Sequence, residues 1–197
     1  MASFNTHLAI AKLYAKRNKV KDLASFYKGN IDPDLTDNKD TTHYGVTPNS
    51  FVNAWVRVEN KVDLAKFLKH NKLDNDLNLG RFLHLVTDKK LFDEFYGKEY
   101  LENCGHDMFT ADNFYSYSVI NTHLVERYNV DSLKIHEILD FGYMQKQISH
   151  AWDKIFSARD LLDYIPKCII DTDKLDKFIE EVASLDLQSI AKLARNS

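Results

Sequence analysis

Glycine and proline are scarce in this 197-residue chain, which contains 6 glycines and 3 prolines. An average protein has roughly 7% glycine and 5% proline, and β-sandwiches and β-barrels place both residues in their many turns. The shortage argues against those folds. Cysteine is also scarce. The chain has two, Cys104 and Cys168, which are far apart in the sequence, and neither belongs to a CxxC pair. We therefore expect neither a disulfide framework nor a cysteine-based zinc site.

The chain also lacks a large excess of charge and a long apolar run. Its 26 basic and 29 acidic residues give a formal net charge of -3, so no global field draws the protein onto double-stranded nucleic acid or an anionic membrane. No stretch approaches about 18 uninterrupted apolar residues, and the N-terminus has no basic region followed by an apolar run. We expect a cytoplasmic protein without a transmembrane segment.

What is present favours a folded, helical protein. Apolar residues make up 44% of the chain and charged residues 28%, which are ordinary values for a globular domain. We predict a single all-α domain over 1–197, with a core over 1–130 and further helices over 131–197. Apolar residues recur at helical spacing and predict a first helix that begins just after Asn5 or Thr6 and ends near Asn18. The same spacing predicts further helices near 22–28, 49–70, 76–96, 112–128, 131–140, 144–156, 158–165, 172–183 and 186–195.

A polar stretch over 29–48 interrupts the helical pattern and is predicted to be a long loop. Such connections are uncommon in compact domains unless they have a role such as binding a ligand or a metal. The stretch contains Asp32-Pro33-Asp34, followed nine residues later by His43. Carboxylates and imidazoles together form the ligand sets of hydrolytic zinc, iron or manganese sites.

His84 and Asp88 form the most informative pair in the sequence. They are four residues apart in an apolar helical stretch, so they share one helix face. Burying an imidazole and a carboxylate is costly unless the two groups pair with each other or bind a cation. His7, in the first turn of the first predicted helix, and His43 would each be interpreted as surface residues if taken alone.

Four short motifs follow one another in a recognisable order. The order and spacing resemble the zinc-dependent phospholipase C family, an all-helical superfamily that also includes the single-strand-specific zinc nucleases. The resemblance lies within 1–130. The motifs are Asn5-Thr6-His7-Leu8, Gly29-Asn30-Ile31-Asp32-Pro33-Asp34, Thr42-His43-Tyr44 and Leu83-His84-Leu85-Val86-Thr87-Asp88.

The resemblance implies a helical bundle of that type with a hydrolytic metal centre. Asp34, His43, His84 and Asp88 would bind one metal, and His7 would bind a second metal bridged to the first by Asp88. Asp34 would also be the catalytic general base, because a carboxylate beside an activated water is well placed to take its proton. We expect about one to two zinc, iron or manganese ions per chain and a small-molecule or lipid phosphoester substrate.

The sequence departs from the family's pattern at several positions. Glu94 stands where the phospholipases have a further histidine, and Leu35 stands where they have an aromatic residue that lines the headgroup pocket. His123 and Glu126 are three residues apart, whereas the family's His-xxx-Glu pair is four residues apart. These departures weigh against a third metal site and against a choline-lipid substrate.

Two other functions stay open at this point. The chain could be a binding or regulatory protein that keeps the metal as a structural staple and has no turnover. Alternatively, Gly105-His106-Asp107 contains the His-Asp dipeptide of HD-type nucleotide phosphohydrolases, and His106 and Asp107 would then form the site.

Overall fold

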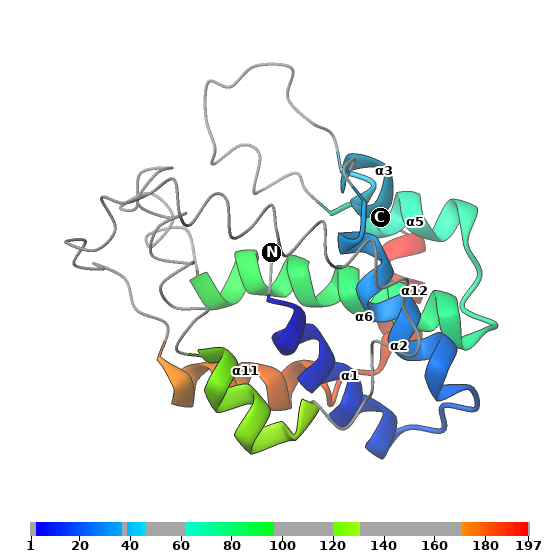
Figure 1. Cartoon of the computed structure of the whole chain (residues 1–197). Coiled ribbons are helices and arrows are strands. Elements are labelled where there is room, and N and C mark those ends of the chain that lie inside the picture. Colours follow the sequence, from blue (N-terminus) through cyan, green and yellow to red (C-terminus); the bar gives the residue numbers. More distant parts are fainter. Residues whose placement is uncertain (1–2, 37–38, 46–61, 97–119, 131–170, 197) are drawn as a thin grey trace.

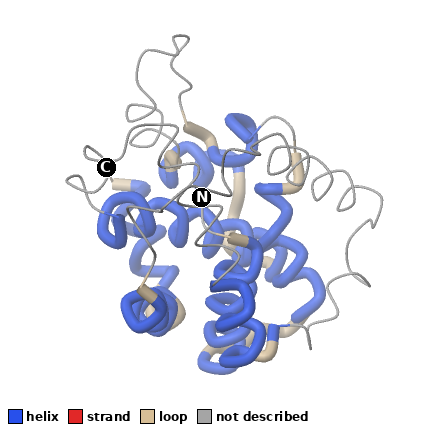
Figure 2. The backbone as a smooth tube through the Cα atoms, turned by 60° about the vertical axis from the view of Figure 1, so that its left-hand side comes forward, coloured by secondary structure: helices blue, strands red, loops and turns tan. Residues whose placement is uncertain are grey.

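The computed structural model describes residues 3–36, 39–45, 62–96, 120–130 and 171–196 (Figure 1). These parts are helices joined by short connections, and they contain no strand (Figure 2). The prediction of an all-α fold is therefore confirmed. The elements are α1 (Phe4–Arg17), α2 (Leu23–Ile31), the 3-10 turn η1 (Asp32–Asp34), α3 (Lys39–His43), α5 (Leu64–His70), α6 (Asp76–Lys90), the π-helix η2 (Leu91–Tyr96), α11 (Thr172–Val182) and α12 (Leu187–Arg195), together with a helical stretch over 120–128.

Side-chain caps define where several helices begin. Ser3 caps α1, and its hydroxyl accepts a hydrogen bond from the Thr6 amide. Asn75 caps α6 in the same way. Asp171 and Asp186 cap α11 and α12, so the predicted starts of the two C-terminal helices are confirmed. The predicted helices over 131–140, 144–156 and 158–165, most of 49–70 and part of 112–128 lie outside the described residues, as does Gly105-His106-Asp107.

The predicted loop over 29–48 is wrong in part. α2 continues through Ile31, η1 follows directly, and α3 ends at His43. The helix persists here because Gly29, Asn30 and Ile31 are buried in helix packing, which overrides the polar composition of the segment.

α6 packs against α1, α2 and α5, and it crosses α2 at two glycines (Figure 1). A Cβ atom on Gly29 would lie 2.0 Å from the Leu77 carbonyl oxygen, and one on Gly80 would lie 2.1 Å from the Phe26 carbonyl oxygen. No larger residue fits at either position without moving the backbone. The crossing therefore brings the backbone at the end of α2 directly against α6.

The C-terminal helices pack on the first half of the chain. α11 contacts α1, and α12 contacts α5. The Lys174 ammonium on α11 donates a hydrogen bond of 2.6 Å to the Phe95 carbonyl oxygen, and Phe178 packs against Phe95 with ring centroids 5.3 Å apart. Arg17 on α1 pairs with Glu180 on α11.

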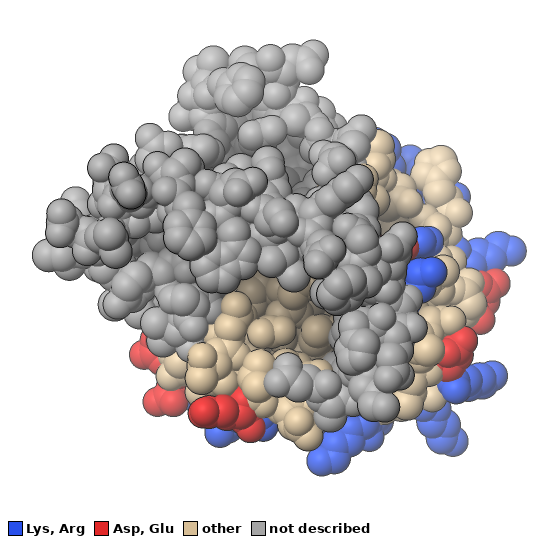
Figure 3. All heavy atoms as spheres, in the orientation of Figure 1, with Lys and Arg blue, Asp and Glu red and all other residues tan. Residues whose placement is uncertain are grey.

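The described surface is mixed in charge. On the face shown in Figure 3, basic and acidic side chains alternate along the lower and right-hand edges. Within the described ranges, none of the helices has both the length and the apolar character that a bilayer crossing requires.

Candidate metal centre

Five buried side chains from four elements converge at the centre of the helical core. His7 comes from α1, Asp34 from η1 and His43 from the end of α3, while His84 and Asp88 lie one turn apart on α6. Asp34 is the most exposed of them, at 6%. These are the residues that the sequence motifs singled out, and the interpretation of His7 and His43 as surface residues is wrong. Metal binding by these five residues stays a prediction.

Three ligand atoms form a compact triangle. The Nε2 atom of His43 lies 3.2 Å from the Nε2 atom of His84 and 3.2 Å from Oδ2 of Asp88. The third side, from His84 Nε2 to Asp88 Oδ2, measures 3.6 Å. Asp34 Oδ1 lies 3.7 Å from His43 Nε2, so a second carboxylate stands beside this triangle.

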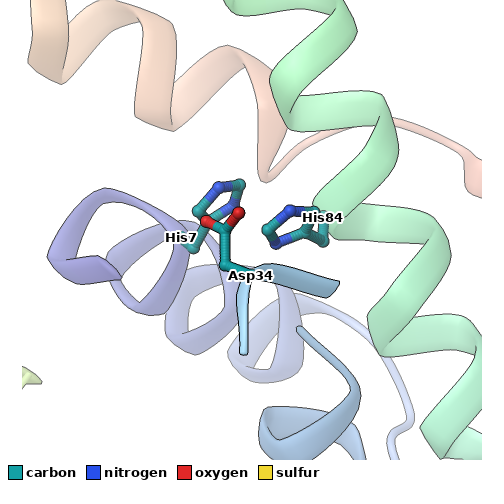
Figure 4. A group of neighbouring side chains, drawn as sticks. All are labelled: His7, Asp34 and His84. Carbon is teal, nitrogen blue, oxygen red and sulfur yellow. The ribbon is translucent and has the colours of Figure 1, made fainter. Parts of the chain in front are cut away.

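His7 extends the cluster on the other side of Asp88. Its Nε2 atom lies 3.4 Å from Asp88 Oδ1, so the two oxygens of Asp88 face different imidazoles. Figure 4 shows the Asp34 carboxylate directed toward the rings of His7 and His84. The ligand atoms of these three residues lie within 4.8 Å of one another, as do those of His43, His84 and Asp88.

The protonation state of His84 follows from its hydrogen bond to the backbone. Its Nδ1 atom lies 2.7 Å from the carbonyl oxygen of Asn30, and a carbonyl can only accept. Nδ1 therefore carries a proton and donates it. Burial lowers the pKa of His84 to about 3, and neighbouring His7 adds to the lowering. The ring is neutral at pH 7, and its Nε2 lone pair faces the cluster.

Asp88 is an ionised carboxylate in a nearly dry site. Burial by itself raises the pKa of this residue, but nearby positive charge holds the pKa well below its ordinary value. The residue is 1% exposed. A cation held among these side chains would compensate the charge of this buried anion.

His7 has buried ring nitrogens that a bound ligand could satisfy. Its side chain is fully buried, and in the described part of the chain neither ring nitrogen has a hydrogen-bond partner. The ring stacks on His84 with centroids 3.8 Å apart and planes 11° apart. An unsatisfied buried polar group costs about 1 to 3 kcal/mol, and a bound metal would remove that cost.

The structure separates the two aspartates of Asp32-Pro33-Asp34. Arg81 on α6 donates from Nε to Asp32 Oδ2 at 3.0 Å and also pairs with it through Nη2. This ion pair fixes η1 against α6, and Asp34 then faces the cluster. Residue type alone does not distinguish the two carboxylates, because the distinction depends on where Arg81 lies in the fold; the family resemblance is what selects Asp34.

The residues at the departures from the family pattern make other contacts. Glu94 is exposed on η2 and pairs with Lys90. His123 pairs with Asp176 on α11 at 3.0 Å. Leu35 is partly buried against the hydrophobic core.

Comparison of the chain with protein-family models, curated proteins and solved structures gives no match.

Proposed function

We propose that this protein is a metal-dependent hydrolase that acts on a phosphoester and has a centre similar to that of the zinc-dependent phospholipases C. The observation that carries the proposal is the triangle formed by His43, His84 and Asp88. Ligand atoms at about 2.0 to 2.1 Å from a tetrahedral zinc ion lie about 3.3 Å from one another. The three measured separations of 3.2, 3.2 and 3.6 Å are close to that value.

The chemistry of the donor set fits zinc, iron or manganese. Three imidazoles and two carboxylates are available, and the carboxylates together neutralise a divalent cation. Calcium and magnesium prefer sites made of oxygen atoms, so the three histidines disfavour them. One ion would be held by the triangle with Asp34 beside it, and His7 with Asp88 Oδ1 offers part of a second position.

When bound, a metal of this kind acts as a Lewis acid that polarises a phosphoryl oxygen and activates water at neutral pH. The residues of the chain have distinct roles around it. Asp88 is the deepest carboxylate and orients the imidazoles. Asp34 is more exposed and lies on a short turn, so its carboxylate accepts the proton of the attacking water. The water oxygen then bonds to phosphorus while the P–O ester bond breaks. The leaving oxygen keeps the bonding electron pair and takes up the proton from Asp34, which regenerates the carboxylate.

A non-catalytic metal staple is the second candidate. It is favoured by the depth of the site, because four of the five side chains are 3% exposed or less. A buried metal that joins α1, η1, α3 and α6 would stabilise the fold without any turnover.

The first experiment compares Asp34→Asn with Asp32→Asn, which lies two residues away in the same turn and whose amide oxygen can still accept the hydrogen bond from Arg81 Nε. Protein purified without a histidine tag is analysed for metal and assayed with bis(p-nitrophenyl) phosphate and p-nitrophenyl phosphate. We expect wild type to hydrolyse one of them, with activity lost to a chelator and recovered with zinc. Removing the proposed base in Asp34→Asn should lower turnover by about 10²- to 10⁴-fold, and Asp32→Asn should keep most of it.

Three outcomes decide between the candidates. A content of less than about half an equivalent of transition metal per chain would contradict the proposed metal centre. A protein that binds metal and is stabilised by it, but hydrolyses no phosphoester at any metal loading, would be a staple. Equal turnover in metal-loaded Asp34→Asn and wild type would remove Asp34 from the mechanism.

A further inference from the structure

We propose that Thr42 is a positioning residue of this centre, whose hydroxyl group fixes the tautomer of His43. The inference rests on the proposed function, because it concerns how the same metal is held. It adds a residue that is not itself a ligand and that acts only through His43.

The direction of each hydrogen bond follows from counting protons. The Thr42 hydroxyl lies 2.7 Å from the carbonyl oxygen of Pro33. A threonine hydroxyl has one proton and a carbonyl only accepts, so that proton is committed to Pro33. The same Oγ1 atom lies 3.1 Å from Nδ1 of His43. Oγ1 can only accept there, and the His43 Nδ1 atom must therefore carry a proton and donate it.

This tautomer is the one that a metal requires. A neutral imidazole protonated on Nδ1 has its lone pair on Nε2, and Nε2 is the atom of His43 that faces His84 and Asp88 at 3.2 Å. In the opposite tautomer, a hydrogen would point into the ligand triangle. The Nδ1 lone pair would also face a lone pair of the Thr42 oxygen, which is repulsive.

Thr42 joins the two ligands that lie on short elements. Pro33 directly precedes Asp34 in η1, and His43 directly follows Thr42 at the end of α3. One hydroxyl group therefore ties the turn that carries Asp34 to the imidazole of His43. His84 is held in the equivalent tautomer by a backbone carbonyl, that of Asn30, which no side-chain substitution removes. Thr42 is thus the position where the role of tautomer control can be tested.

The test uses two substitutions at Thr42 and one matched control. Thr42→Val removes the hydroxyl group and keeps the branched shape, whereas Thr42→Ser keeps the hydroxyl group. Thr87→Val is the control, because Thr87 is buried, directly precedes Asp88, and donates its hydroxyl proton to the Leu83 carbonyl oxygen at 2.8 Å. Affinity for Zn²⁺ is measured by competition with a chromophoric chelator. Two-bond ¹H–¹⁵N NMR correlations report the tautomer of His43 in the metal-free protein, and circular dichroism checks folding.

We expect Thr42→Val to weaken zinc affinity by about 10- to 100-fold, and Thr42→Ser and Thr87→Val to weaken it by less than about 3-fold. In wild type, the NMR signals of His43 should be those of the Nδ1-protonated ring, and Thr42→Val should lose this preference. Equal affinities for Thr42→Val and Thr87→Val would overturn the inference, and so would a serine variant as weak as the valine variant.

The outcome for Thr42 can be distinguished from that of the proposed function. If wild type binds no metal, the proposed function fails, and the tautomer of His43 in that metal-free protein still decides the role of Thr42. If Thr42→Val does not fold, the serine variant and the wild-type spectrum decide it. An Nε2-protonated His43 in wild type contradicts the inference in either case.

Discussion

At the scale of single residues, His7 and His84 form a stacked pair whose ring nitrogens differ in their hydrogen bonds. Both rings are fully buried. The Nδ1 atom of His84 has the Asn30 carbonyl as its partner, whereas the nitrogens of His7 have no hydrogen-bond partner among the described residues. Because an unsatisfied buried imidazole is costly, we expect His7 to contribute to stability when a ligand reaches its ring.

We expect His7→Leu to raise the free energy of unfolding in the presence of a chelator by about 1 kcal/mol, because it removes an unsatisfied buried group. Added zinc should stabilise this variant less than it stabilises wild type. Urea unfolding with and without chelator measures both effects. His70→Leu serves as a control, because His70 is exposed on α5 and its replacement should not change the response to zinc. A His7→Leu protein that is less stable than wild type in chelator would contradict this account.

Sequence reasoning finds ligand side chains better than it finds the groups that orient them. The spacing of His84 and Asp88 indicates a shared helix face, and the structure shows both residues buried on α6. The role of the Asn30 carbonyl has no signal in the sequence, because every residue has a carbonyl. The role of Thr42 was also missed, since it depends on Pro33 lying within hydrogen-bond distance of its hydroxyl group.

At the scale of elements, amphipathic periodicity and caps predict α11 and α12 closely, because each helix is short and buries one face. The region of η1 and α3 is predicted poorly. These elements are only 3 and 5 residues long and carry few apolar residues, so local periodicity cannot reveal them. They are held by contacts distant in sequence, such as the pair formed by Asp32 and Arg81.

The helical stretch over 120–128 is joined to α11 by one buried carboxylate. Asp176 on α11 accepts hydrogen bonds from the Tyr128 hydroxyl group at 2.8 Å and pairs with His123 at 3.0 Å. Arg127 adds an ion pair, with its Nε atom 2.8 Å from Asp176 Oδ2. Asp176 thus contacts three side chains of the neighbouring helix and fixes its position on α11.

The hydrogen bond between Tyr128 and Asp176 leads us to expect a loss of stability at alkaline pH. Burial, and next the hydrogen bond to Asp176, raise the pKa of Tyr128 to about 12, whereas an unfolded tyrosine titrates near 10. Between these values the folded state binds more protons than the unfolded state, so the contribution of Tyr128 is complete below about pH 10 and is lost as the pH rises toward 12. The free energy of unfolding should decrease more between about pH 9 and about pH 11.5 for wild type than for Tyr128→Phe. Equal slopes would show that Tyr128 titrates normally.

At the scale of the whole molecule, α1 and α6 carry side chains of the cluster and also lead to contacts with the C-terminal helices. α1 carries His7 and also binds α11 through the pair formed by Arg17 and Glu180. η2 continues directly from α6, which carries His84 and Asp88, and its Phe95 carbonyl accepts the hydrogen bond from Lys174. Lys90 at the end of α6 pairs with Glu181 at 3.2 Å. These contacts connect the cluster of five side chains to helices that carry none of them.

We expect the described helices to unfold as one unit, as the predicted single domain over 1–197 requires. Free zinc at about 100 times its dissociation constant adds about 2.7 kcal/mol to the free energy of unfolding. If unfolding is cooperative, hydrogen exchange of the most protected amides should slow by about 100-fold in α11 as well as in α6, although α11 holds none of the five proposed ligands. Asp88→Ala is the control: zinc should change exchange in neither helix, because Asp88 contacts all three imidazoles of the centre. Slower exchange confined to α1, α3 and α6 would mean that α11 and α12 open independently, and the single-domain prediction would then be wrong.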